Sequence, residues 1–215
     1  MDIRDQINRY GYRKTAFDII LKIGYRAVKG QIFNVYALPT DGFTTNTFIA
    51  DSIPYSFGFM ELEQLLPLIR PEEMTMNHEF AKKGYAKGDK CFGVIDGENL
   101  AHYSWYATSP TVVLDELKFH FMKNKVYMFN AYTSRKYRGE KLYPLAVTQA
   151  VKSYISKGFD GALTIIAANN YSSISAIKQI GFSAIGRFYV SSVGGSYVYP
   201  SSGCTNNGVS LVRSL

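Results

Sequence analysis

Runs of hydrophobic and β-branched residues, separated by turn-forming residues, recur from position 31 to the end of the chain. They predict strands at residues 31–38, 111–117, 125–133, 161–168, 183–191 and 209–212. A hairpin is predicted from residues 91–95 and 100–107, because Asp96-Gly97-Glu98-Asn99 between them contains the Asp-Gly pair of tight turns. The chain is therefore expected to contain a sheet of several strands.

Helical patterns lie between these strands. They predict helices at residues 60–69, 71–84, 144–157 and 171–180. The second begins with Pro71-Glu72-Glu73 and the third with Pro144, as the first turn of a helix allows. The first two are expected to cover one face of the sheet, and residues 40–48 are predicted to form a long loop.

The N-terminus has a different pattern. Apolar residues at helical spacing alternate with basic ones over residues 2–23, with an interruption near Gly11. We interpret residues 1–28 as a basic amphipathic helix and residues 29–215 as the main domain. This helix either packs on the domain or makes a peripheral contact with an anionic membrane.

Composition narrows the class of protein. The chain has 215 residues, of which 47% are hydrophobic and 19% charged, as in a single globular α/β unit. A net charge of +7 favours anionic partners, but the basic residues form no long block, so a nucleic-acid partner is disfavoured. No apolar run reaches the ~20 residues of a membrane span, and no signal peptide is evident, so we expect a cytoplasmic protein.

Cysteine and histidine give no sign of a metal site. Cys91 and Cys204 have neither metal-ligand spacing nor the pattern of a disulfide framework, so we interpret them as structural thiols in a reducing compartment. His78, His102 and His120 are scattered along the chain. Any of the three could act as a base, and a lone histidine on a strand is more often structural.

The connection from residue 134 to residue 143 is a candidate anion site. It follows a predicted strand, reads SRKYRGEKLY, and leads into a helix. A helix start presents unpaired N–H groups and the positive end of the peptide dipole, and the neighbouring arginine and lysine add charge. The segment lacks the Gly-Lys-Ser/Thr ending of a Walker loop and the three glycines of a dinucleotide fingerprint.

Two motifs in order carry a resemblance to a known family. The run Tyr137-Arg138-Gly139-Glu140-Lys141-Leu142-Tyr143 is followed by Asn170-Tyr171-Ser172-Ser173-Ile174 and then by Gly181-Phe182. Together they resemble the signature of the Gcn5-related N-acetyltransferases (GNAT), over roughly residues 88–190. The resemblance implies a mixed, mostly antiparallel α/β sheet with helices on both faces and two splayed central strands, the first of them a bulged strand at residues 127–133.

The resemblance also implies a cofactor, acetyl-CoA or another acyl-CoA, whose pyrophosphate is held by backbone amides and whose pantetheine pairs with the strand near Thr133. The cofactor-binding positions carried over are Thr133, Arg138, Gly139, Glu140, Lys141, Leu142, Tyr143 and Asn170. Lys141 stands where the family usually has a second glycine, and Tyr143 where it has glycine or alanine.

Catalysis is less well defined by the resemblance. The tyrosine that many family members use as a general acid is replaced by Ile177. Positioning and a polarising amide could supply much of the rate. Candidate catalytic groups beside the expected opening are Asn130, Tyr132 and Tyr143, with Tyr189 as a further polar group.

The function predicted is transfer of an acyl group, with acetyl favoured, from acyl-CoA to a small-molecule amine. A finer resemblance, to members associated with bacterial surface polysaccharide synthesis, indicates an amino group on a nucleotide-linked or lipid-linked sugar. Two alternatives stay open: a catalytically silent binding module, and a transferase that uses a carrier protein or an aminoacyl-tRNA as donor.

Overall fold

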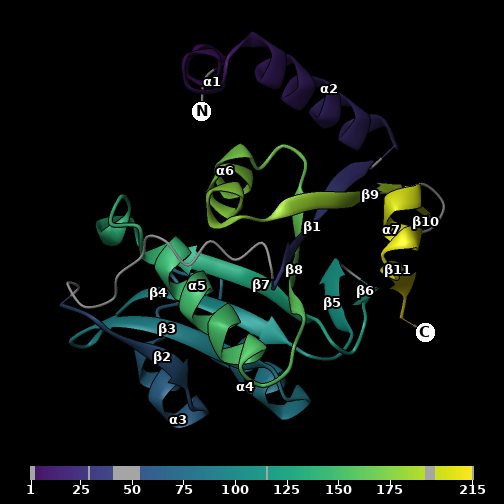
Figure 1. Ribbon diagram of the computed structural model, residues 1–215. Helices are drawn as coiled ribbons and strands as arrows, with labels where there is room; N and C mark the ends of the chain where they lie inside the picture. Colours follow the sequence, from purple (N-terminus) through teal and green to yellow (C-terminus); the bar gives the residue numbers. More distant parts are fainter. Residues whose placement is uncertain (1–2, 29, 41–53, 115, 192–196, 215) are drawn as a thin grey trace.

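The computed structural model describes residues 3–28, 30–40, 54–114, 116–191 and 197–214, and of residues 25–28 the backbone alone. An eight-stranded sheet runs through it in the order β10-β9-β1-β8-β7-β4-β3-β2. Every neighbouring pair is antiparallel except β7 and β8, which are parallel. The mixed, mostly antiparallel sheet predicted from the sequence is confirmed (Figure 1).

The strands of this sheet are β1 (Gln31–Pro39), β2 (Ser56–Met60), β3 (Lys90–Asp96), β4 (Asn99–Ala107), β7 (Val126–Thr133), β8 (Gly161–Ala167), β9 (Ser183–Ser191) and β10 (Tyr197–Pro200). The helices are α1 (Ile3–Tyr10), α2 (Tyr12–Val28), α3 (Leu62–Leu65), α4 (His78–Lys87), α5 (Leu142–Ile155), α6 (Tyr171–Ile180) and α7 (Ser202–Asn206). A small sheet of order β11-β6-β5 consists of β5 (Thr111–Leu114), β6 (Leu117–His120) and β11 (Ser210–Arg213).

Helices cover both faces of the large sheet, as predicted. On one face, α5 and α6 bury apolar residues such as Val147 and Ile177 against sheet residues such as Met128. On the other face, α3 and α4 cover the end of the sheet that contains Trp105. The rest of that second face is covered by the small sheet and α7, around Phe119.

Strand β1 lies inside the sheet although it comes first in the chain. It pairs with β8 on one side and with β9 on the other. Its residues reach both layers, because Val35 packs toward the small sheet and Tyr36 toward α5. The N-terminal strand therefore joins β8 to β9 within one continuous sheet.

Two predicted helices differ from the structure. Residues 60–69 were expected to be one helix, but Met60 ends β2 and only a short helix with a 3₁₀ turn follows. The helix expected at residues 71–84 begins instead at His78, because the Asn77 side chain accepts a hydrogen bond from the Phe80 N–H and caps the helix there. The Pro71-Glu72-Glu73 start was therefore wrong.

Three further details correct the sequence interpretation. The single strand expected at residues 111–117 is a β-hairpin, β5 and β6. Helix α5 begins at Leu142, two residues before Pro144. Strand β10 and helix α7 were not predicted at all. Most of the loop predicted at residues 40–48 lies outside the described residues.

The N-terminal helices attach to the domain through polar contacts. The predicted break is present, since Gly11 separates α1 from α2 with φ of 81°. Asp18 of α2 accepts a hydrogen bond from Asn169 at 2.9 Å and pairs with Lys22 at 2.8 Å. The Tyr171 hydroxyl donates to the backbone of Lys14 at 2.8 Å. Among the described residues, no helix is long and apolar enough to cross a bilayer.

Candidate functional site

The central feature is the point where the two parallel strands separate. Strands β7 and β8 pair only at Val126 with Ala162, Tyr127 with Leu163 and Met128 with Thr164. Beyond these three pairs β7 continues to Thr133 and β8 to Ala167 without pairing to each other. The splayed central strands predicted from the sequence are confirmed.

A β-bulge in β7 marks the start of the gap. Along β4, Tyr103 pairs with Tyr132 and Trp105 with Phe129, so β7 holds one residue more than its partner. Asn130, inside this bulge, has a positive φ of 42°. The bulge expected in this strand is therefore present.

The Asn130 side chain is held by a chain of hydrogen bonds. The Thr75 hydroxyl donates to the Asn130 Oδ1 at 2.7 Å. The Thr75 oxygen lies 2.9 Å from the Tyr103 hydroxyl, which is then the donor of that pair. The amide NH₂ of Asn130 is left to interact with other groups.

The start of α5 is where the sequence predicts an anion site. Gly139 has φ of 96° and Lys141, at the N-cap, has φ of 59°. Lys141 therefore has a left-handed backbone at the position where the resemblance has a second glycine. No described group accepts from the N–H groups of residues 140–143, and a side chain built on Gly139 would meet no described atom within 4 Å.

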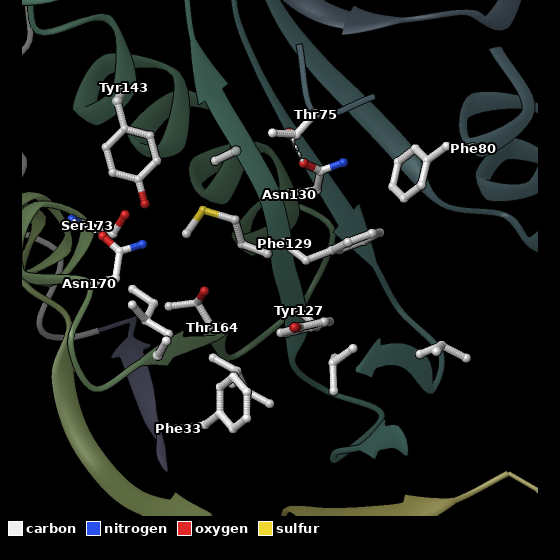
Figure 2. Close-up of a pocket in the computed structure, with 17 residues that line it drawn as sticks. Phe33, Thr75, Phe80, Tyr127, Phe129, Asn130, Tyr143, Thr164, Asn170 and Ser173 are labelled. Atoms are coloured by element: carbon white, nitrogen blue, oxygen red, sulfur yellow. Dashed lines mark hydrogen bonds between the residues drawn. The ribbon is translucent and has the colours of Figure 1, made fainter. Parts of the chain in front are cut away.

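A cavity of about 400 Å³ occupies the gap. Its lining includes Asn130 and Ala131 from β7, Ile166 from β8, Tyr143 from α5 and Asn170 at the start of α6. Figure 2 shows the Tyr143 hydroxyl pointing toward Asn170 and Ser173. Burial raises the pKa of Tyr143, so this hydroxyl stays protonated at neutral pH.

Asn170 also has a structural role. Its Oδ1 accepts from the N–H of Ser173 at 3.2 Å and from the hydroxyl of Ser172 at 3.1 Å, which caps α6. The same side chain lines the cavity. Of the residues predicted to bind the cofactor or to catalyse, Asn130, Tyr143 and Asn170 line this cavity, with Asn130 on the side of β7 opposite Tyr143 and Asn170.

The other predicted residues lie around the cavity rather than in it. Leu142 is buried in the core, and Arg138 is exposed with its guanidinium over the Tyr132 ring. Glu140 accepts a hydrogen bond from the Tyr55 hydroxyl at 2.7 Å. Tyr132 lines a separate hollow with Glu72 and Arg135, and Tyr189 is exposed on β9 beside Tyr199.

Thr133 contacts a buried histidine. The His102 Nδ1 lies 2.8 Å from the Thr133 hydroxyl, and its Nε2 finds no partner among the described residues. Burial lowers the pKa of His102 to about 3, so the ring is neutral at neutral pH. Its ring centroid lies 5.6 Å from that of Tyr143, which places His102 behind the cavity wall.

The position of the family's tyrosine acid is part of the core. Ile177, a residue of α6, is fully buried. Sequence reasoning missed Thr75, Phe80 and Thr164, which line the cavity. The wrong helix start placed Thr75 inside a predicted helix. The Asn77 cap before Phe80 was the signal that could have corrected this start.

Comparison with known proteins supports the fold. No family model matches the sequence, and no curated protein matches it. A GNAT-family acetyltransferase structure from Novosphingobium aromaticivorans has a TM-score of 0.51 at 13% identity, covering 74% of this chain and 62% of its own. A GCN5-related N-acetyltransferase-like protein from Streptococcus suis has a TM-score of 0.52 at 10% identity, covering 80% and 65%. A GNAT-family acetyltransferase from Colwellia psychrerythraea has 0.50 at 13%, covering 74% and 54%.

The match spans only 54% to 65% of the length of those three proteins. At such identities the likeness concerns the arrangement of the backbone and not the substrate. The chain has the mixed α/β fold of GNAT acetyltransferases.

Proposed function

We propose that this chain transfers an acyl group from an acyl-CoA thioester to an amine. The observation that carries the proposal is the parting of β7 from β8 beside the start of α5, where N–H groups have no described acceptor. Amides at a helix start suit a diphosphate, and the gap admits a thin, extended chain. Arg138 and Lys141 add positive charge near the same turn.

When bound, acyl-CoA supplies an activated acyl carbon: the amine nitrogen bonds to that carbon, the carbon–sulfur bond breaks, and the proton lost by the amine ends on sulfur. The residues of the chain position the reactants and hold protons where they are needed. Tyr143 keeps a protonated hydroxyl directed into the cavity and is the candidate donor. Asn130, fixed by Thr75, offers amide N–H groups from the bulge.

Calorimetric titration with CoA tests the anion site at the start of α5. Gly139 and Gly158 lie at opposite ends of α5, have φ of 96° and 90°, and both have open space beside them. Gly139→Ala and Gly158→Ala should therefore cost similar stability. We expect Gly139→Ala to weaken CoA binding by about tenfold or more, since about 1.4 kcal/mol of lost amide contacts has that effect, while Gly158→Ala leaves it unchanged.

Adenosine, which lacks the diphosphate, should bind more weakly than CoA. A wild-type protein that binds neither CoA nor acetyl-CoA would overturn the proposal. If both glycine variants weakened CoA binding equally, the diphosphate would not bind at the start of α5.

The acceptor predicted from the sequence is an amino sugar linked to a nucleotide or a lipid, as in surface polysaccharide synthesis, and acetyl is the acyl group that the resemblance favours. The net charge of +7 suits such phosphorylated acceptors. Thiol release, measured with acetyl-CoA against a panel of amines and amino sugars, tests this choice. CoA binding without turnover would favour a silent module, and binding of acylated carrier protein or aminoacyl-tRNA without CoA would favour the other donors.

A further inference from the structure

The cavity passes through the sheet. Met128 and Ile166 belong to the core under α5, whereas Phe33, Phe129 and Ile165 belong to the opposite face, and all five line the same cavity. Figure 2 shows Tyr143 and Asn170 on one side of β7 and Phe80 and Phe129 on the other. The gap between the strands therefore connects a polar half beside α5 and α6 with a second half on the far face.

The far half is mostly apolar, with the hydrogen-bonded pair Thr75 and Asn130 at one edge. Phe80 comes from α4, and Val112 comes from β5, so this part lies between the two layers that cover the far face. The rings of Tyr127 and Phe129 stack with centroids 5.5 Å apart, and Phe80 lies 6.4 Å from Phe129. None of the 17 described residues that line the cavity carries a formal charge.

We propose that this apolar half holds the acyl chain of the donor, and that the preferred donor is a CoA thioester of a fatty acid longer than acetic acid. The inference rests on the proposed function, which puts the thioester in the gap. An acetyl group ends there, whereas a longer chain continues past Phe129 toward Phe80 and Val112. Each methylene group removed from water contributes about fourfold in affinity.

Binding of three ligands tests the inference without any need for turnover. Calorimetry is carried out with CoA, acetyl-CoA and octanoyl-CoA on the full chain. Octanoyl-CoA has six more methylene groups than acetyl-CoA, and partial burial of these groups predicts binding that is tighter by at least about tenfold. CoA and acetyl-CoA should differ little.

A matched pair of valines locates the chain. Val112 lines the cavity and is 53% exposed, and Val212 is 49% exposed on the same small sheet. Both pair with Lys118, one from each side, so Val112→Asp and Val212→Asp should perturb folding alike. We expect Val112→Asp to weaken the binding of octanoyl-CoA by about tenfold or more, because the bound acyl chain would remove water from the new carboxylate. The affinity for acetyl-CoA should stay unchanged. Val212→Asp should change neither ligand.

The outcomes separate this inference from the function on which it rests. Equal affinities for acetyl-CoA and octanoyl-CoA, with CoA itself bound, would overturn the longer donor and leave acyl transfer standing. Equal effects of the two valine variants on octanoyl-CoA would place the chain outside this groove and also overturn the inference. Failure of all three ligands to bind would overturn both.

Helix α2 carries a second, independent observation. Its side toward the domain is polar, with Thr15 and Asp18 buried. Its outer side is apolar: Phe17 is exposed, and Ile20 and Ile23 are 64% and 61% exposed. An ordinary surface helix has the reverse arrangement, so this face is built to be covered.

Charge indicates what covers it. Residues 3–24 contain five basic residues and two acidic ones, and one of the acids, Asp18, is paired with Lys22. A second copy of the chain would bring like charges together, whereas an anionic bilayer accepts both the apolar side chains and the flanking cations. We infer that α2 rests on an anionic membrane surface.

Vesicle sedimentation tests this contact. The full chain should bind vesicles that contain phosphatidylglycerol, bind phosphatidylcholine alone more weakly, and lose binding at high salt. Ile20→Asp should reduce binding by about tenfold or more, because a carboxylate replaces a buried apolar group, while Val212→Asp leaves it unchanged. Equal binding by both variants would overturn the inference, as would a wild-type dimer that Ile20→Asp dissociates.

Discussion

Two residues at the site have backbone conformations that residues other than glycine usually avoid. Among the described residues other than glycine, only Asn130 and Lys141 have positive φ, 42° and 59°. Such a conformation costs a residue with a Cβ about 1–2 kcal/mol, and it costs asparagine less. Asn130 lies in the bulge where the gap opens and Lys141 at the N-cap of α5, so the surrounding elements hold both conformations.

Lys141 allows a direct test of that constraint. Lys141→Gly should unfold at equal or slightly higher denaturant concentration, because glycine adopts the left-handed conformation without strain. Lys141→Val should lose about 1 kcal/mol or more of unfolding free energy, since a β-branched residue resists positive φ. Urea denaturation of the three proteins measures this, and a Val variant as stable as the Gly variant would contradict it.

His102 predicts a dependence of stability on pH. Its pKa is lowered from 6.5 to about 3 by burial, so the unfolded chain binds more protons than the folded one between these pH values. The free energy of unfolding therefore has its full contribution from neutral His102 above about pH 6.5. As the pH falls toward 3, this contribution is lost at up to about 1.4 kcal/mol per pH unit.

Replacement isolates this contribution from that of other groups. Urea denaturation of wild type and His102→Gln at pH 7 and pH 5 should show a smaller loss of stability in the variant. His120→Gln, at an exposed position on β6, serves as the control and should follow wild type. Parallel behaviour of wild type and His102→Gln would mean that residue 102 does not supply the slope.

At the scale of elements, the cavity depends on how a few strands and helices end. Strands β7 and β8 pair at three positions and then separate, and α6 begins at the cap that Asn170 provides. Helix α4 begins late, at His78, which leaves Thr75 in a turn where its hydroxyl can hold Asn130. The same endings that shape the elements therefore place the polar groups of the site.

The cap on α6 can be separated from the cavity function of Asn170. Asn170→Ala removes the acceptor for the Ser173 N–H and should lower the unfolding free energy by about 1 kcal/mol. Asn170→Ser keeps a capping oxygen and should lose only a few tenths. Thermal unfolding gives the comparison, and equal losses in the two variants would show that the cap contributes nothing.

How far the sequence predicts these elements depends on whether their signals are local. Helix α6 was predicted with its observed bounds because Asn170 and Gly181 mark its two ends within the segment itself. The hairpin around Gly97 was predicted for the same reason. The predicted start of α4 was wrong because Pro71 with two glutamates also has the residues typical of a first helical turn, although the true N-cap, Asn77, is a local signal as well.

At the scale of the whole molecule, the important feature is the place of β1. Nothing in residues 31–38 distinguishes a central strand from an edge strand, because the partners, β8 and β9, lie more than 120 residues away in the chain. The fold class followed from motifs at residues 137–182, whereas the strand order required long-range pairing that no local pattern reports. The same holds for the Thr75–Asn130 contact and for the apolar half of the cavity.

This arrangement predicts that the chain tolerates loss of its first helices but not of its first strand. Deletion of residues 1–28 removes the Asn169–Asp18 and Tyr171–Lys14 hydrogen bonds and should cost on the order of 1–3 kcal/mol, leaving cooperative unfolding and CoA binding in place. Deletion of residues 1–39 also removes β1, which leaves β8 and β9 with unpaired edges and opens the core around Val35. That protein should show no cooperative urea transition. A cooperative transition in the longer deletion, or its absence in the shorter one, would mean that the boundary of the folding unit is not between α2 and β1.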